Sequence, residues 1–289
     1  MNNILLVAFG KRGYGLMTHN LALSLKHHSP DVNIHLFITE PLEQYLNREH
    51  YASINRIEFD DFNDHRGVAP AKIKARIYEL GRSIGLESFL YLDVDAICLN
   101  PIESFFDELR GSTIATEIID KGGKGDNINY SIWAKQSDIW DFFKLEDDTT
   151  LCAIQSSWMY FEHSEVCDKI QEYLTWYMLK GVPVSILKQM WGRTFAIPDE
   201  LLYQGVFAKM GIVPEMPVTP KHRILFGNKK NKTTVETAEN EFYLLSMYGD
   251  DRLTQKKWIK LYDKHLSSID MLNFHPADMV MRDKFVAIK

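Results

Sequence analysis

The sequence lacks any apolar run long enough to cross a membrane. No stretch of the 289 residues approaches the roughly 18–20 consecutive apolar residues of a membrane-spanning helix. The apolar run at residues 4–9 has no positive charge before it and is shorter than the apolar region of a secretory signal. We therefore expect no integral membrane segment and no export.

Cysteine is scarce. The chain has 3 cysteines, an odd number, and Cys98, Cys152 and Cys167 show no metal-binding spacing. This argues against a disulfide framework or a zinc site and favours free thiols in a reducing compartment. We expect a cytoplasmic protein, or one in a host cytoplasm if the chain is viral.

Positive charge is not in excess either. The net charge is −6, with 33 Lys and Arg against 39 Asp and Glu, so the whole surface is not built for nucleic acid. A hydrophobic content of 45% is enough for a sizeable core.

Apolar segments of strand length alternate with helical patterns along the chain. The expected strands lie at residues 4–9, 33–39, 54–59, 89–98, 112–117 and 153–161. Helices are expected to open at Pro70, near Ile102, near Ser164 and at Pro198, and another is expected after Gly15. Unbroken apolar strands between helices predict an α/β sheet covered on both faces.

The expected strand at residues 89–98, FLYLDVDAIC, carries two carboxylates one residue apart. Strand alternation puts Asp93 and Asp95 on one face, where they repel each other unless a cation or a shared proton joins them. Ligands gather at the carboxyl ends of strands in open α/β sheets. Mg²⁺ and Mn²⁺ favour one or two carboxylates together with substrate phosphates. The sequence therefore predicts a divalent cation site here, and a strand that runs out into a solvated turn is the alternative.

These residues also carry a family resemblance. The run from Arg76 to Leu80, the segment FLYLDVD and the pair Asn100-Pro101 resemble nucleotide-sugar-dependent glycosyltransferases of the GT-A fold, most closely family 8, which includes glycogenin-like and bacterial sugar transferases. The resemblance runs from the first strand to about Met210 and returns near His275. It implies an α/β fold of GT-A type: a Rossmann-like mixed sheet flanked by helices, in a single domain with a C-terminal extension.

The resemblance also implies different roles for two regions of the chain. Residues 1–215 would form the nucleotide-sugar-binding and catalytic core, and residues 216–289 would complete the metal or acceptor site within the same domain. The reaction would move a sugar from a nucleoside-diphosphate sugar, a UDP-sugar first of all, to an acceptor hydroxyl. Mn²⁺ or Mg²⁺ on Asp93 and Asp95 would bridge the diphosphate, with Val94 beside the donor.

Further donor contacts are expected near the first strand and on the preceding helix. Phe9 ends the strand, and Gly10 permits close approach of a nucleotide. Lys11 is placed to meet a phosphate and Tyr14 to stack on a base, although a plain tight turn explains the same residues. Arg76 matches the family's donor-binding cation, with a solvated helix face, shared with Lys72, as the alternative.

Three candidate catalytic residues follow from the resemblance. Gln155, in the sequence Gln-Ser-Ser, stands where the family has Asn-Ser-Gly and would bond sugar hydroxyls; an ordinary strand start is the alternative. Asp199 and Glu200 stand where the family has Asp-Gln at a helix start, facing the anomeric carbon or the acceptor. Helix capping explains them equally well. Because a carboxylate can act as a general base where an amide cannot, the stereochemical outcome stays open.

A third metal ligand is expected from the C-terminal part. His275 follows a strand-like segment at residues 271–275, as the family's metal-binding histidine does, but the Lys-Pro-Trp motif that follows it there is absent. A structural histidine is the alternative.

Residues 216–235 contain no acidic residue. The segment has five basic residues: Lys221, Arg223, Lys229, Lys230 and Lys232. A solvated polar loop explains them, and so does contact with an anionic acceptor such as a phosphorylated glycan, a lipid phosphate or nucleic acid. Modified bases in DNA, glycosylated as in bacteriophages, are one such acceptor.

Two readings outside glycosyl transfer remain. Haloacid-dehalogenase-like phosphatases also use Asp-x-Asp, with Asp93 as the nucleophile, but their motif lies near the start of the domain. A module that binds a nucleotide-sugar without turnover would use the same scaffold.

Overall fold

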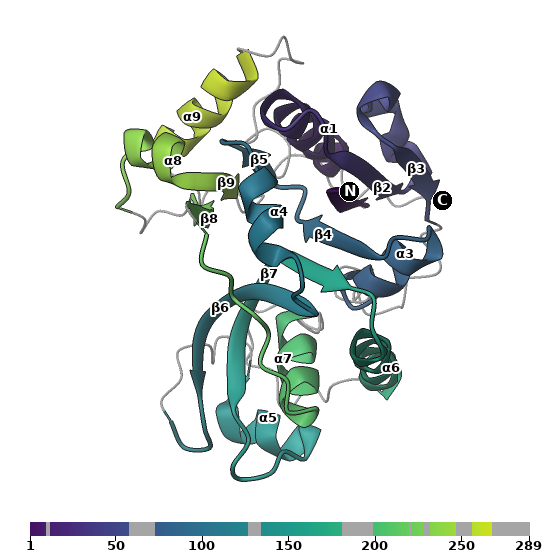
Figure 1. Ribbon diagram of the computed structural model, residues 1–289, viewed down its shortest axis with the longest axis vertical. Helices are drawn as coiled ribbons and strands as arrows, with labels where there is room; N and C mark the ends of the chain where they lie inside the picture. Colours follow the sequence, from purple (N-terminus) through teal and green to yellow (C-terminus); the bar gives the residue numbers. More distant parts are fainter. Residues whose placement is uncertain are drawn as a thin grey trace. The chain divides into compact units, whose positions relative to one another are not determined.

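The computed structural model describes residues 1–9, 12–57, 73–126, 134–180, 199–219, 221–227, 232–246 and 256–267 (Figure 1). The chain folds into two compact units. The first comprises Met1–Ile57, Leu90–Arg110 and Val218–Lys289, and the second comprises Glu58–Phe89 and Gly111–Pro217. The domain boundary expected at residue 215 stays a prediction.

The main sheet is mixed and six-stranded, in the order β3-β2-β1-β4-β7-β6. Parallel pairing joins its first four members: β1 (Asn3–Ala8), β2 (Asn33–Ile38), β3 (Ser53–Arg56) and β4 (Ser88–Leu92). Most side chains of β1 and β4 are buried, whichever face they point to. This is the pattern of a parallel sheet covered on both sides, as the sequence predicts.

The chain leaves this sheet at Asp93. β4 ends at Leu92, a turn contains Val94 and Asp95, and β5 (Ala96–Cys98) then joins a different sheet. The prediction of one continuous strand over residues 89–98 is wrong, and with it the argument that both carboxylates share a strand face. Burying two carboxylates in a fully covered strand is too costly, so the backbone turns where they occur.

The second sheet has the order β5-β9-β8 and recruits the C-terminal part of the chain. β9 (Phe242–Ser246) pairs antiparallel with β5 and parallel with β8 (His222–Phe226). Trp258 and Leu261 of α9 (Lys256–Ser267) pack onto this sheet, and α8 (Val235–Glu241) adds Ala238. The explanation of residues 216–235 as a solvated loop is therefore wrong for β8, whose Ile224 and Leu225 are buried.

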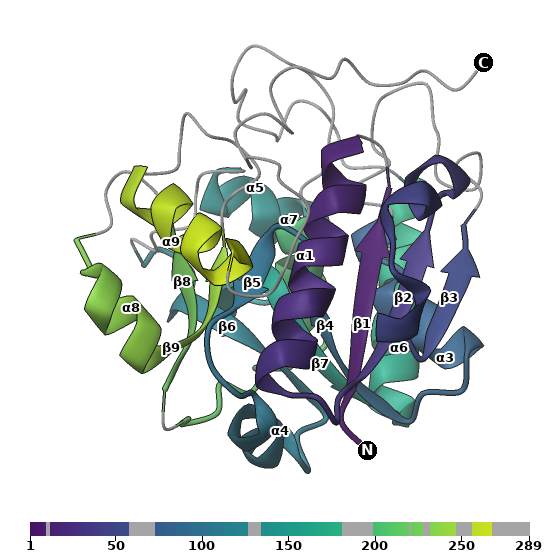
Figure 2. The same cartoon turned by 90° about the horizontal axis from the view of Figure 1, so that it is seen from above.

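Helix α1 (Arg12–His28) connects the elements of the first unit. Its Ser24 Oγ accepts a hydrogen bond from Cys98 N at 2.9 Å, which holds β5. Its Asn20 Nδ2 donates to the Tyr262 hydroxyl of α9 at 2.7 Å. Figure 2 shows α1 running beside β1, with α9 close to it. The unit also contains α4 (Glu103–Leu109) and the 3-10 helices η1 (Glu40–Tyr45) and η2 (Arg48–His50).

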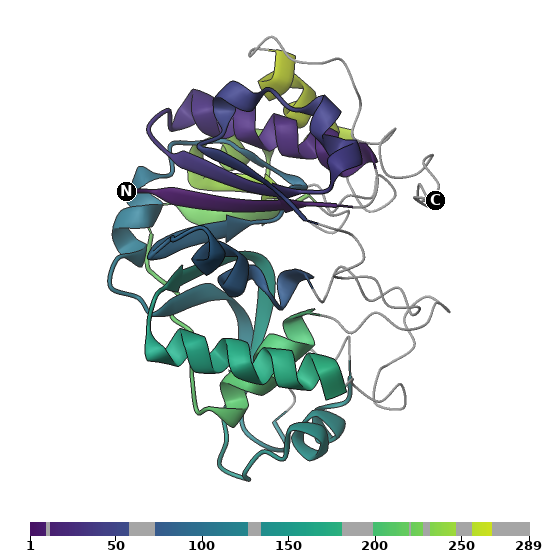
Figure 3. The same ribbon diagram turned by 90° about the vertical axis from the view of Figure 1, so that its right-hand side faces the viewer.

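The second unit is built around an antiparallel pair, β6 (Ile114–Gly122) and β7 (Leu151–Glu162). Its helices are α3 (Ile77–Ser83), α5 (Gln136–Phe143), α6 (Glu165–Lys180) and α7 (Asp199–Lys209). Figure 3 shows α6 and α7 side by side. Helix α7 packs closely on α5, because a Cβ on Gly205 would lie 2.2 Å from the Phe143 ring.

Most of the elements expected from the sequence are confirmed, with shifted ends. The expected strands at 33–39, 54–59, 112–117 and 153–161 correspond to β2, β3, β6 and β7, and the helices after 102, 164 and 198 to α4, α6 and α7. The helix start expected at Pro70 and the strand at 271–275 lie outside the described residues. No helix among the described residues is long and apolar enough to span a membrane.

Three histidines gather where α1 meets α9. The His28 ring lies 4.8 Å from His27 and 5.9 Å from His265, between centroids. Burial, reinforced by these two neighbours, lowers the pKa of His28 to about 4. Burial also lowers the pKa of His265, against the opposing effect of Glu239. The unfolded chain therefore binds more protons between pH 6.5 and 4 than the folded chain does.

We expect stability to fall as the pH drops from 6.5 towards 4, since folding then requires a neutral His28. The His28→Gln variant should lose less stability over this range than the unchanged protein. Urea unfolding at pH 7.5, 6 and 5 measures the difference. Equal pH dependence in the two proteins would contradict this account.

Candidate functional site

The carboxyl ends of the parallel strands meet at one edge of the first unit's sheet. Leu6 pairs with Leu92 and Ala8 with Ile38, so Phe9, Thr39 and Asp93 all follow at this edge. This is the edge at which ligands bind in open α/β sheets. The turn with the two carboxylates therefore lies where a binding site is expected.

The turn itself is anchored on both sides of Asp93. Val94 is buried, and the Tyr91 hydroxyl donates a 2.6 Å hydrogen bond to Asp93 Oδ1. Asp93 and Asp95 stay partly exposed. The local sequence explains this arrangement, because buried residues alternate with the acids and pull the backbone inward around them.

The donor chemistry of this turn fits a hard divalent cation. Two carboxylates supply oxygen ligands, and Mg²⁺-type sites commonly complete their shell with substrate phosphates and water. Within the described ranges, no group of three or more His, Cys, Asp or Glu residues is placed to hold a metal. His275, the expected third ligand, lies outside those ranges.

The remaining donor candidates of the first unit fall, in the sequence, between the end of β1 and the first turn of α1. Phe9 is partly buried directly after β1. Tyr14 is partly buried and packs against Leu16 and Met17. Gly10 and Lys11 lie outside the described residues. The nucleotide contacts expected here stay predictions.

The second unit brings Asp199 together with two side chains that the sequence did not single out. Asp199 begins α7, and Ser156 Oγ of β7 donates a short hydrogen bond to its Oδ2. Lys74 Nζ donates to Ser156 Oγ at 3.2 Å and lies 3.5 Å from Asp199 Oδ2. In sequence, Ser156 directly follows the candidate Gln155, and Lys74 lies two residues before the candidate Arg76.

The other candidates of this unit lie near that group in sequence but make different contacts. Arg76 forms a two-pronged ion pair with Glu79, at 2.8 Å from Nε and 2.5 Å from Nη2. Gln155 is partly buried and lies opposite Glu117 of β6. Glu200, second in α7, is also partly buried. Their expected roles stay predictions.

The basic residues of the C-terminal part are only partly described. Lys221 Nζ donates to the Asn240 carbonyl, Arg223 is partly buried on β8, and Lys232 is exposed. Lys229 and Lys230 lie outside the described ranges.

Comparisons with known proteins agree on the fold. No family model matches the sequence, and no curated protein matches it. The structure of the bifunctional glycosyltransferase WbbM matches with a TM-score of 0.57 and a sequence identity of 12%. The match covers 93% of this chain and 50% of the WbbM chain, so this chain spans half of that structure. The galactosyltransferase LgtC, solved with donor and acceptor sugar analogues, matches with a TM-score of 0.52 and a sequence identity of 12%. That match covers 94% of this chain and 97% of the LgtC chain. The structure of an active-site mutant of LgtC matches with a TM-score of 0.52 and a sequence identity of 13%.

At this level of identity the likeness establishes the fold. The chain has the GT-A fold of these glycosyltransferases, as its sequence resemblance implied. Family 8 membership is consistent with the LgtC match and is not fixed by it.

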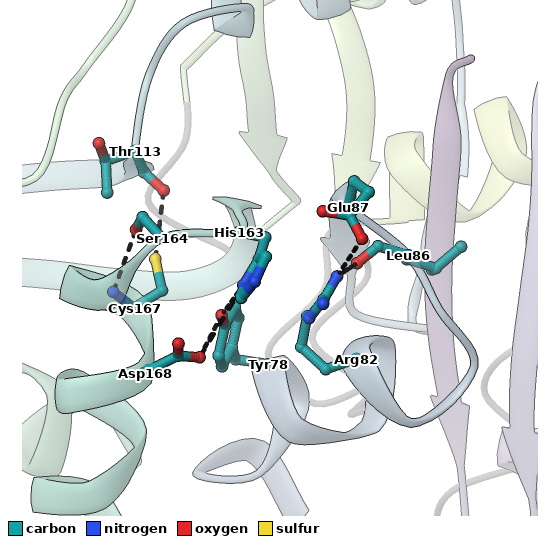
Figure 4. Close-up of polar contacts among 9 residues, drawn as sticks. All are labelled: Tyr78, Arg82, Leu86, Glu87, Thr113, His163, Ser164, Cys167 and Asp168. Atoms are coloured by element: carbon teal, nitrogen blue, oxygen red, sulfur yellow. Dashed lines mark hydrogen bonds and ion pairs between the residues drawn. The ribbon is translucent and has the colours of Figure 1, made fainter.

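A second polar cluster, which the sequence did not suggest, joins α3, β7 and α6 (Figure 4). The Tyr78 hydroxyl donates to Asp168 Oδ1 at 2.7 Å and lies 2.8 Å from His163 Nδ1, which must then be the donor to the tyrosine oxygen. Burial and the bond to Asp168 raise the pKa of Tyr78. The His163 backbone N–H bonds the carbonyl of Glu87, just before β4. The cluster thus lies at the amino end of β4, whereas a ligand is expected at the carboxyl end.

We expect this cluster to stabilise the fold and to take no part in catalysis. Tyr78→Phe removes both hydrogen bonds while keeping the packed ring, and should lower the free energy of unfolding by about 1 kcal/mol, since both partners are partly exposed to water. Chemical denaturation measures this loss, with Tyr173→Phe, a half-exposed tyrosine on α6, as the matched control. Unchanged stability in Tyr78→Phe would contradict a structural role.

Proposed function

We propose that the protein is a glycosyltransferase that moves a sugar from a nucleoside-diphosphate sugar to an acceptor hydroxyl. The observation that carries the proposal is a GT-A fold shared over 94% of the chain with a galactosyltransferase solved with donor and acceptor sugar analogues. The acidic turn at the carboxyl end of β4 supports it, since this is the expected ligand edge. A UDP-sugar is the first donor to test.

Asp93 and Asp95 are the proposed ligands of Mn²⁺ or Mg²⁺. When bound, the cation would neutralise the diphosphate and favour its departure. Tyr91 holds the Asp93 carboxylate through its 2.6 Å hydrogen bond, and buried Val94 fixes the turn between the acids. His275 is the proposed third ligand. Phe9, Gly10, Lys11, Tyr14 and Arg76 remain the proposed donor contacts.

Asp199, Glu200 and Gln155 are the proposed catalytic residues. A carboxylate near the anomeric carbon stabilises the positive charge that develops there as the diphosphate leaves. Glu200, adjacent to Asp199, is available as a general base for the acceptor hydroxyl. The active-site mutant of LgtC has glutamate in place of glutamine, the same difference that separates Glu200 from the family pattern.

The proposed acceptor is anionic and meets the basic residues of the C-terminal part. Lys221, Arg223 and Lys232, together with Lys229 and Lys230, give this part an acid-free basic segment in a chain of net charge −6. A phosphorylated glycan, a lipid phosphate or nucleic acid would each be attracted to it. Residues 216–289 would thereby complete the acceptor or metal site of a cytoplasmic enzyme.

A screen of nucleotide-sugars with and without Mn²⁺ tests the proposal directly. At least one donor should raise the melting temperature only when Mn²⁺ is present, and should be slowly hydrolysed. If no nucleotide-sugar shifts the melting temperature with Mn²⁺ present, the proposal fails. Cleavage of a generic phosphoester through an aspartyl-phosphate would instead identify a phosphatase, and binding without turnover a binding module.

The acidic turn gives a sharper prediction. Asp93→Asn and Asp95→Asn should each remove the Mn²⁺-dependent rise in melting temperature. At a ligand concentration of 100 Kd, this rise corresponds to a stabilisation of the folded protein by about 2.7 kcal/mol. Both variants should remain folded, because Asp93 and Asp95 are partly exposed residues in a turn and asparagine has nearly the same shape as aspartate. Asp107→Asn, an exposed carboxylate on α4 that pairs with Arg110, is the matched control and should keep the full shift. A full shift in either turn variant would exclude that residue as a ligand.

A further inference from the structure

The Asp199 carboxylate contacts two side chains that lie far from it and from each other in the sequence. Ser156 of β7 donates to its Oδ2, and the Lys74 ammonium lies 3.5 Å from the same oxygen while also donating to Ser156 Oγ at 3.2 Å. The three groups form a closed triangle of polar contacts. Both partners contact the same carboxylate oxygen, Oδ2.

The three side chains are largely buried, so their polar contacts replace contacts with water. Ser156 is completely buried, and the side chains of Asp199 and Lys74 are 14% and 20% exposed. An ionised carboxylate so far out of water requires hydrogen bonds and an opposite charge. Ser156 supplies the first and Lys74 the second. Removing either partner therefore frees the carboxylate to rotate.

Lys74 is itself held in place through its backbone. The Tyr203 hydroxyl donates to the Lys74 carbonyl at 2.9 Å, and Gln171 Nε2 of α6 donates to the next carbonyl, that of Ala75, at 3.0 Å. Tyr203 is fully buried and lies one helical turn after Asp199 on α7. Helix α7 thus contacts Lys74 at both ends, through its backbone and through its ammonium group.

Arg76 occupies a different position in this network. Its guanidinium is engaged by Glu79 in a two-pronged ion pair, whereas the ammonium of Lys74 reaches Asp199. The cation in contact with the candidate catalytic carboxylate is therefore Lys74, although the family resemblance indicates Arg76 as the cation of the site.

We propose that Lys74 and Ser156 are positioning residues that hold Asp199 in one orientation for glycosyl transfer. This inference rests on the proposed function. With Oδ2 fixed by the two partners, Oδ1 keeps a constant direction towards the sugar, so little reorganisation is needed as charge develops at the anomeric carbon. Misplacing a reacting group by about 1 Å costs about 100-fold in rate. The effect should appear in kcat, because the proposed ligands of the diphosphate-binding cation are Asp93 and Asp95 rather than these residues.

Steady-state hydrolysis or transfer kinetics, on the donor found by the Mn²⁺ screen, test the proposal. Lys74→Met and Ser156→Ala should each lower kcat about 10–100-fold and change the KM for the donor less than about 2-fold. In an Asp199→Asn background, neither change should cost further activity, because both act through that carboxylate. Lys124→Met, which breaks an exposed ion pair, and Ser112→Ala, which removes the hydrogen bond from a buried serine to the exposed Glu215 carboxylate, are the matched controls and should keep kcat.

Each outcome decides between the two proposals. If the unchanged protein turns over a nucleotide-sugar while Lys74→Met and Ser156→Ala keep full kcat, the positioning role is wrong and the proposed function stands. Losses that multiply with Asp199→Asn also contradict it, since they would show independent action. If the unchanged protein turns over no nucleotide-sugar, both proposals fall. Lys74→Arg, which keeps the charge, should recover part of kcat, and Ser156→Cys, similar in size, replaces Ser156→Ala if that variant does not fold.

Discussion

The cost of burying charge determines the layout of the first unit. Asp93 and Asp95 interrupt a segment in which Leu90 to Leu92 and Ala96 to Cys98 are otherwise buried. A strand covered on both faces has no place for two carboxylates. The backbone therefore leaves the main sheet after Leu92, exposes the acids in a turn at the ligand-binding edge and enters a second sheet. One electrostatic constraint thus ends a strand and places a candidate site.

The switch of sheets also explains what the C-terminal part does structurally. The segment after the acidic turn needs partners for its backbone, and β9 supplies them along β5. Beyond β5, Leu99 N bonds the Tyr243 carbonyl at 2.8 Å, and Asn100 Nδ2 bonds the Phe242 carbonyl at 2.6 Å. Residues 242–246 therefore hold the chain on the far side of the acidic turn. Changes in the C-terminal part would disturb the turn through these bonds.

An element of this structure can be predicted from the sequence when the residues that determine it lie within that element. Continuous apolar runs such as that of β1 give strands, and Asp199 begins a helix as expected, because these signals lie within the element itself. The end of β4 at Leu92 depends on which sheet can accept the next residues. The strand β8 was not predicted because the segment around it is rich in lysine, although its Ile224 and Leu225 are buried.

The partners of the candidate catalytic residues depend on contacts between elements distant in sequence. Lys74 and Asp199 lie 125 positions apart, and no spacing rule relates them. One local signal was nevertheless present: Glu79 follows Arg76 at i+3, the spacing at which helical side chains pair. An arginine with such a neighbour already has a carboxylate partner, so a cation without an equally placed acid is the better candidate for a distant carboxylate. In the sequence, the positions three and four residues before and after Lys74 hold Ala71, Pro70, Ile77 and Tyr78, none of which is acidic. Weighing such local pairs beforehand favours Lys74 over Arg76 as the partner of Asp199.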